Sequence, residues 1–388
     1  MINQEDQSPL LQSEDWQKLQ NDLGEITFFE EASKYHFLAI KKTTPLGPYL
    51  YLPYGPYLDN SVTSTDIKTC IKQIKTLAKK EHAIFIRIEP QNFTKSIKNS
   101  NLKSMDVLSQ KQKLFNVAQY FKLDQKHLKK TKDLNPAETW CLDLTKPTSE
   151  IIKNFSQGTR TRHNTYQKKG LTVEITRNPE DIKYLAELQH KLAKERHIAS
   201  FSEHYLKSEL SQPFASLYLV RYHQNPESKT PELPELKQSK SKSFATNAKN
   251  AFVESTSNTA KNSKPMPKDG EIIAASLFFD YHGTRFYMQS AANQDFKHLP
   301  ATVALLSHAI FTAKESGLHT LDFWGIAPEN ADHSHPWYGF TEFKKSFGGY
   351  QKTYAGTYDY ISNPTKYKLY SLLRKANRLK RKILKSKD

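Results

Sequence analysis

The sequence feature that most constrains the fold is a helix-into-strand unit that occurs twice. The first unit is a helical pattern at residues 66–80 that leads into an apolar run at 83–88. The second is a helical pattern at 301–316 that leads through a glycine into the apolar run 321–324. A helix that delivers the chain directly into a buried strand is typical of α/β proteins. The two units are similar in pattern, although not in residue identity. From the repeated pattern we expect two related α/β halves.

The length and the apolar content of the chain agree with two cores. A chain of 388 residues is too long for one ordinary core, and 37% hydrophobic residues, with 20 Tyr and 21 Phe, are enough to fill two. We therefore predict an α/β fold whose first domain covers residues 1–145 and whose second covers 146–363. Residues 364–388 are expected to form a basic amphipathic C-terminal helix.

Residues 224–270 differ in composition from the rest of the chain. Ser, Thr, Lys, Asn and Pro dominate there, and aromatic residues are nearly absent. Such a segment has too little apolar surface to offset the entropy of ordering, so we predict a disordered insertion in a hairpin loop. The alternative is an electrostatic tether for RNA or lipid.

The net charge of +17 favours a polyanionic partner, which can be nucleic acid, anionic lipid or a phosphorylated substrate. Much of this charge lies in the C-terminal helix, where leucines share one face and Lys and Arg lie opposite or flank it. This pattern suits a helix that lies on an anionic membrane or on nucleic acid. It also suits a helix that caps a domain and leaves its basic side in water.

The cysteine content and the N-terminal sequence bear on localisation. Cys70 and Cys141 are far apart and not in metal spacing, so they are interpreted as reduced packing residues of a cytoplasmic protein. The N-terminus has neither a basic start nor an apolar run, and no stretch approaches about 18 apolar residues. We expect a cytoplasmic protein with at most peripheral contact at the inner face of the plasma membrane.

The stretch Thr320–Gly349 is the strongest candidate for a site. It begins as a short buried strand, crosses a polar loop, and ends in aromatic residues, Lys344 and a pair of glycines. Loops at strand ends are where α/β proteins place their sites, because the sheet fixes the roots of the loop. The rings, Trp337 among them, and the lysine predict a pocket wall with a cationic group. The alternative is an ordinary surface loop.

Motifs of other chemistries are absent from the sequence. There is no Gly-x-Ser-x-Gly, no P-loop and no dinucleotide fingerprint. Asp332, His333 and His335 lie close together but lack a further ligand at a fixed spacing, so no metal is expected. A CoA enzyme should carry a glycine-rich loop before the helix at 301, and residues 295–300 contain no glycine. No cofactor is therefore expected.

A second cationic cluster lies in residues 151–170, which are expected to form one basic helix. Its charges are Arg160, Arg162, Lys168 and Lys169. The spacing places Arg162 on the same face as Tyr166, which suits phosphate contacts with ring stacking on RNA. A solvated helix face is the alternative.

Several segments together resemble the FemABX family. They are DFWGIAPENADHSHPWYGFTEFKKSFGG, YAGTYDYISNPTKYKLYSLLRK, LLQSEDW, YLPYGPYLD, ETWCLDL, TRHNTYQKKGLTV and FYMQSAAN. The resemblance implies two tandem GNAT-like acyltransferase domains, with mixed sheets flanked by helices. It also implies transfer of an amino acid, often Gly, Ala or Ser, from aminoacyl-tRNA to the stem-peptide amine of a peptidoglycan precursor, either lipid II or UDP-MurNAc-pentapeptide.

The resemblance also assigns residues to the site. Phe343 and Lys344 match the family's Phe-Lys pair at the acyl-transfer site. Arg196 matches an arginine that contacts the precursor's phosphates, and Tyr287 matches a tyrosine that contacts the precursor. Lys41 or Lys42 matches a phosphate-binding lysine of the first domain. The long coiled-coil arm of some members is missing, because no sustained heptads occur.

The expected chemistry needs no nucleophile motif. An aminoacyl ester is already activated, so aminolysis requires alignment and a positive group where the carbonyl oxygen gains charge, which Lys344 supplies. Two alternatives stay open at this point. One is a GNAT-like N-acyltransferase with a different acyl donor, and the other is an inactive basic protein on the same fold that binds RNA or a membrane.

Overall fold

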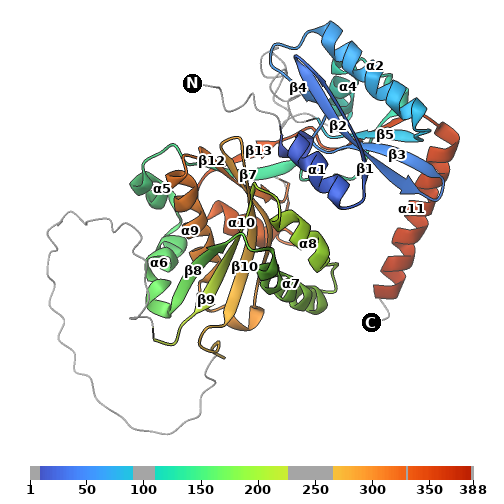
Figure 1. Ribbon diagram of the computed structural model, residues 1–388. Helices are drawn as coiled ribbons and strands as arrows, with labels where there is room; N and C mark the ends of the chain where they lie inside the picture. Colours follow the sequence, from blue (N-terminus) through green and yellow to red (C-terminus); the bar gives the residue numbers. More distant parts are fainter. Residues whose placement is uncertain (1–8, 91–109, 226–264, 329–330, 386–388) are drawn as a thin grey trace, which may run out of the picture.

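The computed structural model describes residues 9–90, 110–225, 265–328 and 331–385, and in them the chain forms two seven-stranded mixed sheets (Figure 1). The predicted α/β class is therefore confirmed. Most of the predicted insertion, residues 226–264, lies outside the described residues.

The first sheet has the strand order β1-β2-β3-β5-β14-β6, with β4 paired to β2. Its strands are β1 (Ile26–Ala32), β2 (Tyr35–Thr44), β3 (Gly47–Leu52), β4 (Tyr57–Leu58), β5 (Phe85–Ile88), β6 (Leu128–Lys130) and β14 (Tyr358–Ile361). Helices α2 (Ser64–Lys80) and α4 (Gln110–Tyr120) cover one face. A capping box between Thr63 and Asp66 starts α2, which buries Ile67, Cys70 and Ile74 against the sheet.

The second sheet has the order β13-β7-β12-β11-β10-β9-β8. Its strands are β7 (Glu138–Asp143), β8 (Leu171–Thr176), β9 (Ala215–Tyr222), β10 (Ile272–Tyr281), β11 (Thr284–Ala292), β12 (Thr320–Gly325) and β13 (Tyr350–Thr353). Helix α9 (Ala301–Glu315), apolar on nearly every side, is buried on one face with α5 (Thr148–Asn154) and α6 (Gln157–Thr165). Helices α7 (Ile182–Arg196) and α8 (Glu203–Leu210) cover the other face.

The repeated helix-into-strand unit has the same role in both halves. Helix α2 leads into β5, which pairs in parallel with β3, and α9 leads into β12, which pairs in parallel with β11. Each of these strands has an antiparallel neighbour on its other side, β14 beside β5 and β7 beside β12. Thus β5 and β12 are equivalent strands of the two sheets, as the sequence pattern predicts.

Sheet membership crosses the predicted division at residue 145. Strand β7 precedes that residue but lies in the second sheet, whereas β14 follows most of the second half and lies in the first. The domain boundaries stay a prediction. What the strands establish is that the two halves are joined by exchanged segments and not by a single linker.

The halves also share an apolar cluster. Helix α1 (Glu14–Asp22), capped by Ser13, packs Trp16 edge-on to Phe279 of β10 at 6.4 Å between ring centroids. Leu38 of β2 and Tyr54 lie in this cluster with residues of α7, α8 and β9. The first half is therefore packed against the second by buried apolar side chains.

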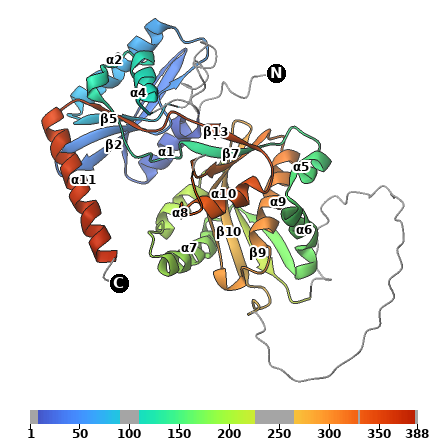
Figure 2. The same cartoon turned by 180° about the vertical axis from the view of Figure 1, so that it is seen from behind.

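Helix α11 (Pro364–Lys385) follows β14, begins beside the first half and projects beyond it toward the C-terminus (Figures 1 and 2). The predicted C-terminal helix is thus confirmed. None of the helices in the described ranges combines the length and the apolar character that a membrane span requires.

The prediction of one basic helix over residues 151–170 is wrong. The chain forms α5 and α6, followed by a short 3-10 turn at Gln167–Lys169. Ser156 leaves the helical conformation and its hydroxyl accepts from the Thr159 backbone N–H, which caps α6 and interrupts the helix.

Candidate functional site

The site candidate lies where β12 ends. The register of β12 with β7 shifts between Asp322 and Gly325, and Trp324 within this shift has a left-handed backbone with φ of 64°. A bulky residue rarely adopts this conformation, and such strain gathers at functional sites. The end of β12 therefore departs from the regular pairing with β7, as a strand does at a β-bulge, and such bulges are common beside active sites.

Asp322 lies just before this bend and is buried, with 3% of its surface exposed. One carboxylate oxygen accepts from the Trp324 backbone N–H at 2.7 Å, and the other accepts from the Thr139 hydroxyl at 3.2 Å. Burial raises the pKa of Asp322, against these hydrogen bonds and the charge of Lys352. No described cation pairs with it directly.

Lys344 reaches the same strand end from helix α10 (Tyr338–Lys345). It is 8% exposed, and its Nζ donates to the Gly325 carbonyl oxygen at 2.6 Å. The ammonium also lies 5.0 Å from the Phe340 ring centroid and 6.0 Å from that of Tyr287. Burial lowers the pKa of Lys344 to about 8, with Asp322 opposing the shift. Near neutral pH this lysine can therefore exchange a proton without a large change in free energy.

An aromatic wall stands beside Lys344. Trp337 and Phe340 lie 5.5 Å apart between centroids and are 42% and 38% exposed. Gly325 permits this packing, because a Cβ there would lie 2.7 Å from Cγ of Pro136 and 3.4 Å from the Trp337 ring. The structure thus places Lys344 behind rings at a strand end, whereas the substrate pocket that the sequence predicts there stays a prediction.

Phe343 and Tyr287 are placed differently with respect to Lys344. The Phe343 ring packs against the core and meets Phe347 edge-on at 5.4 Å, so it fixes the position of α10. Tyr287, on β11, lies under Lys344 although 57 residues separate them in sequence; its hydroxyl donates to Ser290 Oγ at 2.8 Å. Burial raises the pKa of Tyr287 to about 12, so its hydroxyl stays protonated.

The other predicted substrate residues are not in contact with Lys344. Arg196 is the exposed last residue of α7 and forms no ion pair with a described residue. Lys41 pairs with Glu81 at 2.8 Å, and Lys42 pairs with Glu25. A carboxylate therefore neutralises each of these two lysines in the free protein, and their contact with a phosphate stays a prediction.

The predicted RNA cluster is only partly available. Arg160 donates to the backbone oxygens of Lys153 and Phe155, which ties it to the end of α5. Tyr166 is 3% exposed, so the expected stacking of its ring on a base is wrong. The cause is that Tyr166 follows the end of α6 and turns into the core. Arg162, Lys168 and Lys169 remain exposed.

The second half contains two buried carboxyl groups that the sequence analysis does not identify. Asp322 interrupts the apolar run between Leu321 and Phe323, which was a usable signal. Glu209 lies on the apolar face of α8 and is fully buried; one of its oxygens accepts from Gln289 at 3.2 Å. Burial raises the pKa of Glu209 to about 8.

The polar loop after β12 is held by its own contacts. Asp332 accepts from the backbone N–H of Ser334 at 2.8 Å, and the His333 ring packs on Tyr338 at 4.3 Å. His335 Nδ1 accepts from the Trp337 backbone N–H at 3.1 Å. In the part of the chain that the structure describes, no three His, Cys, Asp or Glu side chains are grouped so that they could hold a metal ion.

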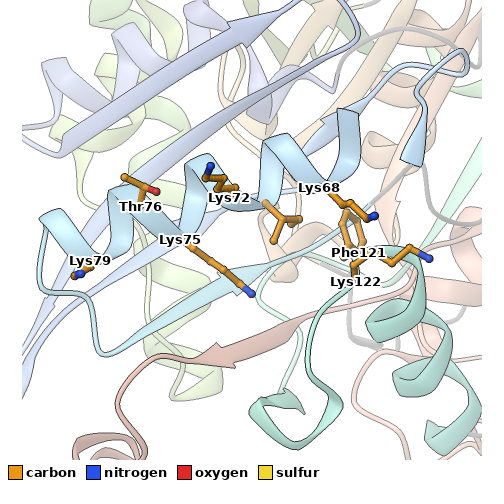
Figure 3. A pocket seen from close by; sticks show the side chains of 8 residues that line it. Lys68, Lys72, Lys75, Thr76, Lys79, Phe121 and Lys122 are labelled. Carbon is orange, nitrogen blue, oxygen red and sulfur yellow. The ribbon is translucent and has the colours of Figure 1, made fainter. Parts of the chain in front are cut away.

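A cationic cavity of about 370 Å³ lies on the first half, between α2 and the turn that follows α4 (Figure 3). Its lining carries five lysines and no acid; they are Lys68, Lys72, Lys75, Lys79 and Lys122. None of the five pairs with a described carboxylate, and Lys75 lies 4.4 Å from the Tyr360 ring centroid. We refer to these residues as the α2 lysine cavity.

The chain is similar to known proteins over nearly its whole length. A sequence profile of the FemAB family matches residues 2–375. No curated protein sequence matches significantly. The crystal structure of FemX superposes with a TM-score of 0.67 at 18% identity, covering 93% of this chain and 94% of FemX.

Two further solved structures are similar at lower identity. The C-terminal domain of a putative lysylphosphatidylglycerol synthetase from Agrobacterium fabrum has a TM-score of 0.52 at 13% identity and covers 92% of this chain and 90% of its own. A tandem GNAT protein from the clavulanic acid pathway has a TM-score of 0.45 at 9% identity and covers 87% and 84%. The predicted fold of two α/β halves, each a mixed sheet flanked by helices, is confirmed.

Proposed function

The chain belongs to the FemAB family, and on that premise we propose that it is an aminoacyltransferase of interpeptide bridge formation in peptidoglycan. The donor is aminoacyl-tRNA carrying an amino acid of the Gly, Ala or Ser class. The acceptor is the stem-peptide amine of a precursor, either lipid II or UDP-MurNAc-pentapeptide. One observation carries the proposal: a buried, unpaired Lys344 stands at a strained strand end beside an aromatic wall.

The chemistry of ester aminolysis fits this lysine. The amine nitrogen bonds to the ester carbon, the carbonyl oxygen gains negative charge, and the ribose oxygen of the tRNA then leaves and takes up the proton lost by nitrogen. An ammonium has three donors, and Lys344 uses one of them on the Gly325 carbonyl. The remaining two are free to stabilise the oxyanion, in a site where burial strengthens the interaction.

The precursor is assigned to the surface around this lysine. Tyr287 supports the acceptor side because it lies under Lys344, and the exposed Trp337 ring offers an apolar wall to the peptide. Phe343 supports the site indirectly by holding α10. Arg196, which is exposed and forms no ion pair with a described residue, is proposed to contact the precursor's phosphates.

The tRNA needs a cationic surface in addition to the site. The surface predicted from the sequence consists of the exposed Arg162, Lys168 and Lys169. Arg160 lies beside it and is bonded to the backbone at the end of α5. The α2 lysine cavity is a second surface of the same charge. A salt series of tRNA binding separates them when it compares variants that lack lysines of one surface or of the other. Each phosphate contact that a variant loses lowers the slope of log affinity against log salt by about 0.7 to 0.9.

The proposal is tested with purified protein, a set of labelled aminoacyl-tRNAs, and each precursor in turn. Wild type should transfer label, and Lys344→Met should lower the rate by about 100-fold or more, the usual cost of losing an oxyanion donor. Lys345→Met is the matched control, because Lys345 is the next residue of α10 and is exposed beside Glu342. It should stay within about twofold of wild type.

Two outcomes contradict the proposal. Consumption of acetyl-CoA with no use of aminoacyl-tRNA would make the protein an N-acyltransferase with a different donor. Binding of RNA or lipid with no turnover on either precursor would make it an inactive binding protein on the same fold.

A further inference from the structure

Helix α11 is attached to the first half along one side only, near its start. Tyr367 is buried and meets Phe85 edge-on at 5.3 Å, and its hydroxyl donates to Asp359 at 2.9 Å. Tyr370 lies 5.1 Å from Phe85. Because Tyr367 and Tyr370 are three residues apart, they share one side of the helix. We call it the docked side.

The leucines of α11 lie away from the docked side. At about 100° per residue they are centred roughly opposite the two tyrosines. Their exposed fractions are 47% for Leu369, 53% for Leu372, 42% for Leu373 and 60% for Leu379. A row of large apolar side chains left in water on a folded protein marks a contact surface. We call this row the leucine face.

The charge of the helix is of one sign. The sequence from Pro364 to Lys385 contains nine Lys and Arg and no Asp or Glu. The exposed basic side chains Arg374, Lys375 and Arg378 lie opposite the leucine face or on its flank. The helix therefore combines an apolar face with a polar face on which every charged residue is basic.

Three occupants of the leucine face can be compared. A second copy of the chain would bring two sets of nine like charges together, which opposes association. RNA would accept the charges but would leave the leucines in water. An anionic bilayer accepts both, since leucines enter the boundary of the acyl chains and basic residues meet the headgroups. We propose that α11 docks on the surface of an anionic membrane through its leucine face.

The position of α11 relative to the first sheet leaves the α2 lysine cavity accessible. Tyr360 of β14 faces α2, whereas its neighbour Ile361 packs with Phe85 and Tyr367 on the other face of the sheet. Thus α11 and the α2 lysine cavity lie on opposite faces of the first sheet. With α11 on a membrane, the lysine cavity faces away from it and stays open to a second anionic partner.

The test uses the full chain and vesicles, with no tRNA or precursor, so that it does not depend on the proposed enzyme activity. Wild type should float with vesicles of phosphatidylcholine and phosphatidylglycerol, and not with phosphatidylcholine alone. Leu372→Glu with Leu379→Glu should lower binding by at least about 10-fold, given the apolar area withdrawn from lipid. Ile26→Glu with Ile175→Glu is the matched control, because these exposed residues lie on β1 and β8.

The control should bind the vesicles as wild type does, and all variants should keep the thermal unfolding midpoint of wild type. Equal vesicle binding by the leucine variant and wild type would overturn the proposal, because contact would then be electrostatic alone. So would absence of wild-type binding to the anionic vesicles. A dimer that the leucine substitutions dissociate, measured by light scattering, would assign the leucine face to a second copy and would also overturn it.

Discussion

The equivalent strands β5 and β12 bury charged residues and treat them in opposite ways. On β5, Arg87 lies across from Asp359 of β14, and the two form a bidentate pair at 2.7 and 2.8 Å. On β12, Asp322 lies across from Cys141 of β7, which offers no charge. The nearby Lys344 bonds to a carbonyl instead. The Arg87–Asp359 pair is satisfied within the fold, whereas Asp322 and Lys344 at the end of β12 form no direct ion pair with a described residue.

The two strands therefore differ in how a buried charge is stabilised. A buried charge is tolerated when a partner and hydrogen bonds replace water, and it is costly when they do not. The first half uses its pair to fix β14 and, through Tyr367, the start of α11. In the second half, the unpaired charges beside a strained strand end are the arrangement expected of a site that binds a charged species only during reaction.

Breaking the satisfied pair should have the largest effect on stability. Asp359→Ala leaves Arg87 buried without a partner, so the free energy of unfolding should fall by about 3 to 5 kcal/mol in urea titrations. Arg87→Met combined with Asp359→Leu removes both charges and should recover most of this loss. A single variant that costs less than about 1 kcal/mol would show that the pair does not hold β14.

Removing Lys344, which has no ionic partner, should instead raise the free energy of unfolding. The folded-state pKa of Lys344 is about 8, below its ordinary 10.5, so the folded protein binds fewer protons between these values. The resulting loss of stability is therefore full below pH 8 and disappears as the pH rises to 10.5. Lys344→Met should gain up to about 3 kcal/mol at pH 7, while losing transfer activity. Unfolding measured at pH 7 and pH 10.5 checks this.

If Lys344→Met were destabilising at pH 7, the lysine would be part of the packing and not a charge held for the reaction. Lys345→Met, changed on the same helix at an exposed position, should leave stability nearly constant at both pH values.

Glu209 extends the comparison to a further buried titratable group of the second half. Its folded-state pKa is about 8, above the ordinary 4.5, so the folded protein binds more protons between these values. Stability from this group is full below pH 4.5 and is lost as the pH rises toward 8. Wild type should lose about 2 to 3 kcal/mol between pH 5 and 7 through this group. Glu209→Gln should remove that slope; an unchanged slope would contradict the assignment.

Much of the fold follows from local sequence pattern. The helix of 66–80 and the strand run of 83–88 correspond to α2 and β5, and the helix of 301–316 corresponds to α9. These elements are periodic and bounded by caps or glycine, so local rules suffice. Strand β14 could not be predicted in its sheet, because its partner β5 lies about 270 residues earlier and only tertiary packing brings them together.

The position of the candidate site follows from the sequence, but its geometry does not. Lys344 among aromatic residues after a strand marks a site, but its burial depends on the bend at Trp324, which no local pattern indicates. The same applies to Lys41 and Lys42, whose partners are Glu81 and Glu25. Sequence shows the charge of a side chain, whereas its partner is a property of the fold.

The smallest expected effects concern these two lysines and sharpen the comparison from the first half. The resemblance offers Lys41 or Lys42 for the precursor's phosphates, but each is paired with a carboxylate and half-buried. Lys41→Met and Lys42→Met should each lower the free energy of unfolding by at most about 1 kcal/mol, as for partly exposed ion pairs.

Each should leave KM for the precursor within about twofold, whereas Arg196→Met should raise it by 10-fold or more, given a lost phosphate contact. A 10-fold rise in KM for either lysine variant, with kcat unchanged, would mean that the carboxylate releases its lysine to substrate. A lysine that is paired in the free protein would then also serve the reaction, and the contrast between the charges of β5 and β12 would no longer separate structural from functional groups.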